Sequence, residues 1–137
     1  MILVDLNVIL DVLQKREPHY RASAAVLDLI LKRDVTAALA GHSVTTIHYL
    51  VAKYQKRETA DQVIGWLLQH FSVATVNWDV LQQATTYGWA DFEDAVVASA
   101  AGAASCKAIV TRNIKDFRDS KVAVLTPDEY LMTREAH

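Results

Sequence analysis

Apolar residues along this chain fall into five short runs, separated by longer segments in which they recur every three or four positions. The short runs predict β-strands over residues 1–4, 35–40, 71–76, 107–111 and 122–125. The segments between them predict helices over residues 6–14, 18–32, 43–56, 58–70, 77–87 and 91–104. The alanines of residues 35–40 leave a helical alternative open for that run.

Capping residues set several of the predicted helix boundaries. Ser43 is the expected N-cap of the helix through Lys56, and Asn77 or Asp79 can cap the helix that Gly88 ends. Residues 126–129, Thr-Pro-Asp-Glu, combine a capping threonine, a first-turn proline and a reciprocal glutamate, which predicts a final helix.

Strands and helices therefore alternate along the whole chain. This order predicts a mainly parallel central sheet with helices on both faces, a three-layer α/β/α sandwich of the Rossmann-like kind. A length of 137 residues with 52% hydrophobic residues suits one domain over residues 1–137, and four Gly and two Pro leave no candidate linker.

Net charge and hydropathy narrow the classes of partner. With a net charge of −2, binding of a nucleic acid must come from local basic patches, such as Lys15 with Arg16, or Arg112 with Lys115 and Arg118. No stretch reaches the ~20 apolar residues of a membrane span. The apolar start of the chain has no basic residue before it, so it does not resemble a secretory signal. We therefore expect a cytoplasmic protein without a membrane partner.

Acidic residues occur where a parallel sheet collects its polar sites, just beyond the carboxyl ends of strands. Asp5 directly follows the first predicted strand, and Asp116 lies five residues past the strand over 107–111. Asp91 and Asp94 begin the alanine-rich helix, and their spacing places them on one face of its first turn, whereas Glu93 points elsewhere. Asp5, Asp91, Asp94 and Asp116 can therefore converge.

Each of these carboxylates also has an ordinary interpretation when it is taken alone. Asp5 and Asp91 are typical helix caps, Asp94 is a favourable first-turn charge, and Asp116 is typical of a surface loop. If they converge, their repulsion requires a cation, and oxygen ligands favour Mg²⁺ or Mn²⁺. A single cysteine and no His/Cys set at ligand spacing make zinc a poor fit.

Three segments resemble the motifs of the PIN domain family, in the family's order. The start, ILVDLNVILDVLQKREPHY, resembles the opening strand, Asp and helix of PIN domains. DFEDAVVASAA resembles the Asp-Ala helix of one PIN subgroup, and IVTRNIKDF resembles the Thr-Arg-Asn-x-x-Asp-Phe loop. The similarity extends from Met1 to the TPDEYL segment, and it implies the same PIN-like α/β fold.

The resemblance implies a role for individual residues of this chain. It places the metal-binding acids on Asp5, Asp94 and Asp116, and supporting roles on Asn7, Thr111 and Asn113. Asp91 matches an acid of the subgroup and could accept a proton during catalysis. Four basic residues could hold flanking phosphates: Arg112, Lys115, Lys15 and Arg16.

The implied function is a Mg²⁺- or Mn²⁺-dependent endoribonuclease of the VapC toxin type. The resemblance also implies an RNA substrate, a small antitoxin protein as partner and a homodimer. One departure supports an alternative: where many PIN nucleases carry a Glu, residues 42–50 contain no acid, and His48 or Tyr49 occupies the place. Asp91 could compensate; otherwise the chain would be a catalytically weakened module that binds RNA or a protein.

Overall fold

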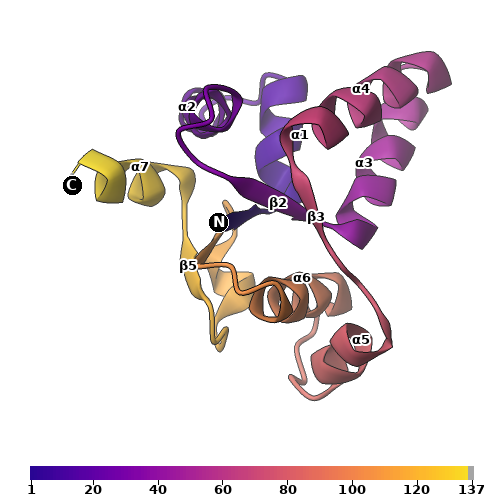
Figure 1. Cartoon of the computed structure of the whole chain (residues 1–137). Helices are drawn as coiled ribbons and strands as arrows, with labels where there is room; N and C mark the ends of the chain where they lie inside the picture. Colours follow the sequence, from indigo (N-terminus) through magenta and orange to yellow (C-terminus); the bar gives the residue numbers. More distant parts are fainter. Residues whose placement is uncertain (136–137) are drawn as a thin grey trace.

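Five short parallel strands form the central sheet in the computed structural model of this chain, which describes residues 1–135 (Figure 1). The strands are β1 (Ile2–Val4), β2 (Ala37–Ala40), β3 (Ser72–Ala74), β4 (Ala108–Val110) and β5 (Ala123–Leu125). They lie in the order β3-β2-β1-β4-β5, and each neighbouring pair is parallel. The strand interpretation of residues 35–40 is thus confirmed.

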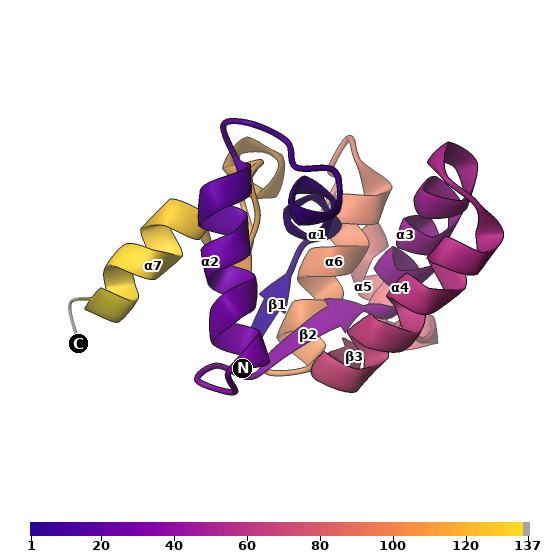
Figure 2. The ribbon, with the colours of Figure 1, turned by 90° about the horizontal axis from the view of Figure 1, so that it is seen from above.

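Helices cover both faces of this sheet, as the alternating pattern predicted. They are α1 (Leu6–Leu13), α2 (Tyr20–Leu31), α3 (Gly41–Tyr54), α4 (Arg57–His70), α5 (Trp78–Thr85), α6 (Phe92–Ala103) and α7 (Pro127–Glu135), with a 3₁₀ turn η1 (Ile114–Phe117). Figures 1 and 2 show α1 to α4 on one side of the sheet, with α7 beside α2, and α5 and α6 on the other. The predicted three-layer α/β/α architecture is confirmed.

Two apolar clusters join these layers. Successive residues of a strand face opposite ways, so Ile2 and Val4 of β1 join the cluster under α1 to α4, whereas Leu3 joins the cluster under α5 and α6. The second cluster includes four alanines of α6, together with Ala38 and Ala40 of β2. Small side chains on both elements let α6 pack closely on the sheet.

The sheet order places the ends of β1 and β4 side by side. From β1 the chain runs outward through β2 to β3, and it then crosses back to β4 on the other side of β1. Such a reversal of direction leaves a crevice beyond the carboxyl ends of the two central strands. Asp5 follows β1 at this crevice, and Thr111 follows β4.

Most predicted helix boundaries hold, and the capping signals explain why. The Asn77 side chain accepts a hydrogen bond from the backbone N–H of Val80 at 3.0 Å, and it therefore caps α5. Gly88, where the predicted helix ends, has a φ of 69°, a left-handed conformation that a residue without Cβ adopts without strain. No helix among residues 1–135 has both the length and the apolar character to cross a membrane.

The expected capping role of Ser43 is wrong. Helix α3 begins at Gly41, directly after the last residue of β2, and Ser43 is buried inside its first turn. Ala40 occupies the position before the helix with an extended backbone, φ −67° and ψ 142°. The chain passes from strand to helix without a loop, so no capping side chain is used there.

The cap of α7 supports a prediction about stability. The Thr126 N–H donates to Glu129 Oε1 at 2.9 Å, and the Glu129 N–H donates to Thr126 Oγ1 at 3.1 Å. We expect Thr126→Ala to lower the free energy of unfolding by about 1 kcal/mol, because the Glu129 N–H loses its acceptor. Denaturant unfolding would measure this, with the surface variant Thr85→Ala as control. Equal destabilisation by both variants would contradict the assignment.

Candidate carboxylate site at the ends of β1 and β4

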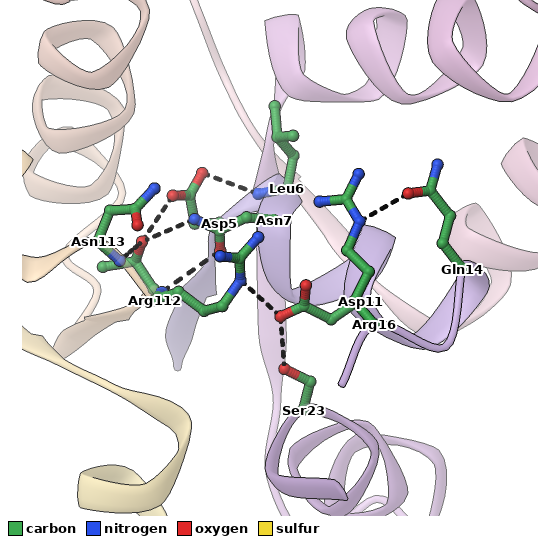
Figure 3. A network of polar contacts seen from close by, with 10 residues as sticks. Asp5, Leu6, Asn7, Asp11, Gln14, Arg16, Ser23, Arg112 and Asn113 are labelled. Carbon is green, nitrogen blue, oxygen red and sulfur yellow. Dashed lines mark hydrogen bonds and ion pairs between the residues drawn. The ribbon is translucent and has the colours of Figure 1, made fainter. Parts of the chain in front are cut away.

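Asp5 is held in one orientation at the start of α1. Its Oδ1 accepts a hydrogen bond from the Leu6 N–H at 2.8 Å, and its Oδ2 accepts one from Thr111 Oγ1 at 2.7 Å (Figure 3). The residue is only 5% exposed, and this burial raises the pKa of its carboxyl above 3.8, although both hydrogen bonds act the other way. Asp5 therefore caps α1, which is its ordinary interpretation from the sequence, and it also presents a carboxylate at the crevice.

The three supporting residues implied by the sequence form one network with Asp5. The Thr111 hydroxyl accepts from the Asn7 side-chain amide at 3.2 Å and from the Asn113 N–H at 3.1 Å. Asn7 Oδ1 in turn accepts from the Arg112 N–H at 3.4 Å. These contacts fasten the first turn of α1 to the segment that follows β4.

Asp91 and Asp94 bring two more carboxylates to the crevice from the start of α6. Asp91 caps the helix by accepting a hydrogen bond from the Asp94 N–H at 3.2 Å. The pKa of Asp94 is raised from 3.8 to about 7, first by its partial burial and then by the negative charges of Asp5, Asp91 and Asp116. The structure therefore brings Asp5, Asp91 and Asp116 within electrostatic reach of Asp94.

Asp116 approaches from the loop after β4. It lies in η1, where its N–H donates to the carbonyl of Asn113 at 3.0 Å, and its side chain is exposed. The predicted helical turn within residues 112–120 is this 3₁₀ turn. Exposure distinguishes Asp116 from the buried Asp5, so a solvent-borne ligand can reach it directly.

His42 also lies near the carboxylates, and sequence reasoning missed it. Its Nε2 is 3.1 Å from the carbonyl oxygen of Glu93, and because a carbonyl can only accept, Nε2 carries the proton. The charge of His42 lowers the pKa of Asp5, against the larger effect of burial. Nothing in the sequence separates this histidine from the others. His48, by contrast, contacts Asp61 of α4 at 2.7 Å.

Arg112 has an internal partner in addition to its place beside the crevice. Its Nε is 2.8 Å from Oδ2 of the fully buried Asp11, which also accepts from the Ser23 hydroxyl at 3.2 Å (Figure 3). The Arg112 side chain is 22% exposed. This ion pair joins the loop after β4 to α1 and, through Ser23, to α2. Phosphate binding by Arg112 stays a prediction.

The other predicted basic residues lie at different distances from the carboxylates. Lys115 is exposed in η1, next to Asp116 in sequence. Lys15 and Arg16 follow the far end of α1, about 12 Å along its eight residues from Asp5. The Arg16 side chain donates to Gln14 Oε1 at 2.7 Å. The structure thus brings Lys115 to the site and leaves Lys15 and Arg16 one helix length away.

The donor set fits a hard divalent cation. Carboxylates only accept when ionised, and the pKa of Asp94 is raised by its burial first and then by the negative charges of the other three. Among residues 1–135, no group of three or more His, Cys, Asp or Glu side chains is arranged so that it could hold a metal ion. The electrostatic effects on Asp94 and the absence of such a group are compatible, since charges interact over longer distances than metal–ligand bonds. An ion at these carboxylates would have to be held partly through water, as Mg²⁺ commonly is, and metal binding here stays a prediction.

Comparisons with known proteins agree with this fold. The sequence pattern of the PIN domain family matches residues 1–115. Ribonuclease VapC1 of Aquifex aeolicus (strain VF5) is 25% identical over 133 residues, which cover 94% of this chain and 92% of that protein.

Solved structures share the fold at lower sequence identity. VapBC2 from Rickettsia felis, in a crystal structure with a DNA fragment from their promoter, gives a TM-score of 0.71 at 20% identity, covering 92% of this chain and 98% of that chain. A toxin–antitoxin complex from Klebsiella pneumoniae gives a TM-score of 0.70 at 18% identity, covering 93% and 98%. The predicted PIN-like fold is thus confirmed.

The Asp11–Arg112 pair leads to a prediction about stability. Arg112→Met should lower the free energy of unfolding by about 3–5 kcal/mol, because it leaves the buried Asp11 charge without a partner. The double variant with Asp11→Leu should recover most of this loss, since no buried charge then remains. Lys32→Met, which breaks the exposed Asp28–Lys32 contact of 2.8 Å, is the control and should cost less than about 1 kcal/mol. Additive effects of the two substitutions would rule out the coupling.

The raised pKa of Asp94 leads to a prediction about pH. Its stabilising contribution is fully present below the unfolded value of 3.8 and is lost as pH rises through about 7, because the ionised form is favoured in the unfolded chain. Asp94→Asn should therefore be more stable than the wild type at pH 8 in chelator, on the order of 1 kcal/mol after solvent screening of a half-buried group. At pH 4 the two should be equal.

Denaturant unfolding of both proteins at pH 4, 6 and 8 would measure this difference. Asp79→Asn, at an exposed acid of α5, is the matched control and should show no gain at pH 8. A wild type that is more stable than Asp94→Asn at pH 8 in chelator would contradict the raised pKa of Asp94.

Proposed function

This chain belongs to the PIN domain family, and we propose that it is a metal-dependent endoribonuclease of the VapC toxin type. The observation that carries the proposal is the electrostatic coupling of Asp94 to Asp5, Asp91 and Asp116 at the ends of β1 and β4. The similarity to ribonuclease VapC1 over 94% of this chain supports the same reaction.

Three of these residues would hold the ion: Asp5, Asp94 and Asp116. When bound, Mg²⁺ or Mn²⁺ would neutralise the carboxylates, orient a phosphodiester and activate water for attack on phosphorus. Asp5 is fixed by Leu6 and Thr111, whereas the exposed Asp116 can adjust. One rigid and one accessible carboxylate would let the ion and the substrate enter together.

Asp91 would accept the proton of the attacking water in this proposal. One of its oxygens accepts the Asp94 N–H as a helix cap, which orients the carboxylate while leaving other lone pairs free. Thr111, Asn7 and Asn113 would keep Asp5 in place through their shared hydrogen bonds. Lys115 would bind a flanking phosphate. Arg112, Lys15 and Arg16 would contact RNA farther from the scissile bond.

A small antitoxin protein and a second copy of this chain are the proposed protein partners. Structural relatives that include a toxin–antitoxin complex support the first. Tyr49 and Tyr54 of α3 support an interface, because both rings are more than 60% exposed. We also propose that residues 1–137 act as one domain, since all the described strands share one sheet.

A second function is favoured by α3. Where the family pattern has a Glu, this helix carries no acid, and it places His42 near Asp5 instead. A weakened metal site would leave a protein that binds RNA or a partner without cutting. Metal affinity separates the two functions.

Metal binding gives the test of the proposed function. Thermal unfolding of the wild type should shift upward in millimolar Mn²⁺ or Mg²⁺ relative to chelator, because an ion at 100 times its Kd stabilises the folded state by about 2.7 kcal/mol. Asp116→Asn should lose both this shift and Mn²⁺-dependent RNA cleavage. Asp128→Asn, at an exposed acid of α7, should keep both.

Two results would contradict the ribonuclease assignment. One is the absence of a shift in the wild type at millimolar metal, which would favour the non-cutting function. The other is unchanged cleavage in both Asp5→Ala and Asp116→Asn.

A further inference from the structure

A hollow of about 320 Å³ opens beside the carboxylate site. Its charged and aromatic lining residues are Trp89, Asp91, Lys115, Asp116, Arg118 and Asp119. Two of them, Asp91 and Asp116, belong to the carboxylate site, so the hollow adjoins the place where the reaction would occur. Its volume lies at the lower end of the ~300–1,000 Å³ range of small-ligand sites, which suits one nucleotide better than a folded partner.

Trp89 forms a fixed wall of this hollow. The residue lies between α5 and α6, directly after Gly88, and it is partly exposed. Its ring meets the buried Phe117 of η1 edge-on, with centroids 5.7 Å apart and an interplanar angle of 82°. Tyr87 packs on it at 5.3 Å. An aromatic ring that is already held in position loses little entropy when a second ring stacks on it.

Lys115 and Arg118 supply positive charge at the same hollow. Both side chains are exposed, and among residues 1–135 neither forms an ion pair, although three carboxylates line the hollow with them. In the proposed site Asp116 would hold the ion and Asp91 caps α6, so Lys115 and Arg118 are the groups of the hollow that can contact phosphates. These two side chains supply local positive charge in a chain whose net charge is −2.

We propose that this hollow is a nucleotide subsite for single-stranded RNA. A base flanking the scissile bond would stack on the Trp89 indole, and Lys115 and Arg118 would contact its phosphates. Stacking on an aromatic ring tolerates every base, so the subsite would position the strand with little sequence preference. The choice of RNA as the ligand rests on the proposed function. The geometry of the subsite does not depend on the metal.

The subsite can be tested by measuring the binding of a fluorescein-labelled pool of 2′-O-methyl RNA octamers of mixed sequence. Anisotropy would give the Kd in Mg²⁺ and again in chelator, with the integrity of the RNA checked on a gel. Trp89→Leu should weaken binding about tenfold or more, because it keeps bulk and loses the stacking surface. Trp89→Phe should restore most of the affinity. Trp78→Leu, at a ring that is 73% exposed outside the hollow, is the control and should bind normally.

Salt dependence tests the two cations. Lys115→Met and Arg118→Met should each weaken binding and reduce the slope of log K against log salt by about 0.7, the value for one phosphate contact to a single strand. Lys121→Met, at an exposed lysine outside the hollow, should leave the slope unchanged. Thermal unfolding of each variant would show that it is folded.

The outcomes separate this inference from the proposed function. If the wild type binds no octamer, or if Trp89→Leu and both cation variants bind as tightly as the wild type, the subsite is overturned, whether or not the protein cleaves RNA in Mn²⁺. If Trp89→Leu loses affinity while the wild type shows neither a metal-dependent shift nor cleavage, the subsite stands and the nuclease assignment fails.

Discussion

The hydrogen bond from Thr111 to Asp5 joins residues 106 positions apart in the chain, and the candidate site depends on it. Parallel pairing of β1 with β4 brings the two residues to the same edge of the sheet. The bond then fixes a buried carboxylate that forms no ion pair within residues 1–135. The Thr111 hydroxyl can orient Asp5 because Asn7 and Asn113 donate to its oxygen, which leaves its proton for the carboxylate.

This constraint sets function against stability. The fold gathers carboxylates from three separate segments, and the pKa of Asp94 is raised by its burial and then by the resulting repulsion. Apolar packing must offset that cost elsewhere, and the alanine-rich α6 does so while it carries Asp91 and Asp94 to the crevice. Such a surplus of negative charge is expected if a bound, hydrated cation, and not a basic side chain of the protein, neutralises the carboxylates.

Local patterns in the sequence predicted most of the architecture. Short apolar runs located the strands and helical spacing located the helices, and the Thr126–Glu129 signal forms the predicted reciprocal cap. The position of Asp5 after a strand was enough to place it at the crevice. Ser43 misled because capping propensity says nothing of a helix that starts directly from a strand.

Tertiary contacts account for what the sequence could not predict. The internal partner of Arg112, the approach of His42 to Asp5 and the contact of Trp89 with Phe117 each join distant segments. A local sequence pattern carries no signal for such pairs. One clue was present in Asp11, a charged residue within a helix whose neighbours are apolar, but its partner could be found only in three dimensions.

The buried Asp11–Arg112 pair also bears on how such a chain can diverge. A change at only one of the two positions leaves the other charged side chain without its partner, which destabilises the protein. A change of both residues to apolar ones leaves no unpaired charge. The two positions should therefore covary among descendants of this sequence, and mutational paths between charged and apolar versions must cross a poorly folded intermediate. A buried charge pair of this kind is therefore retained, and it keeps the loop after β4 in place while the surface residues around it change.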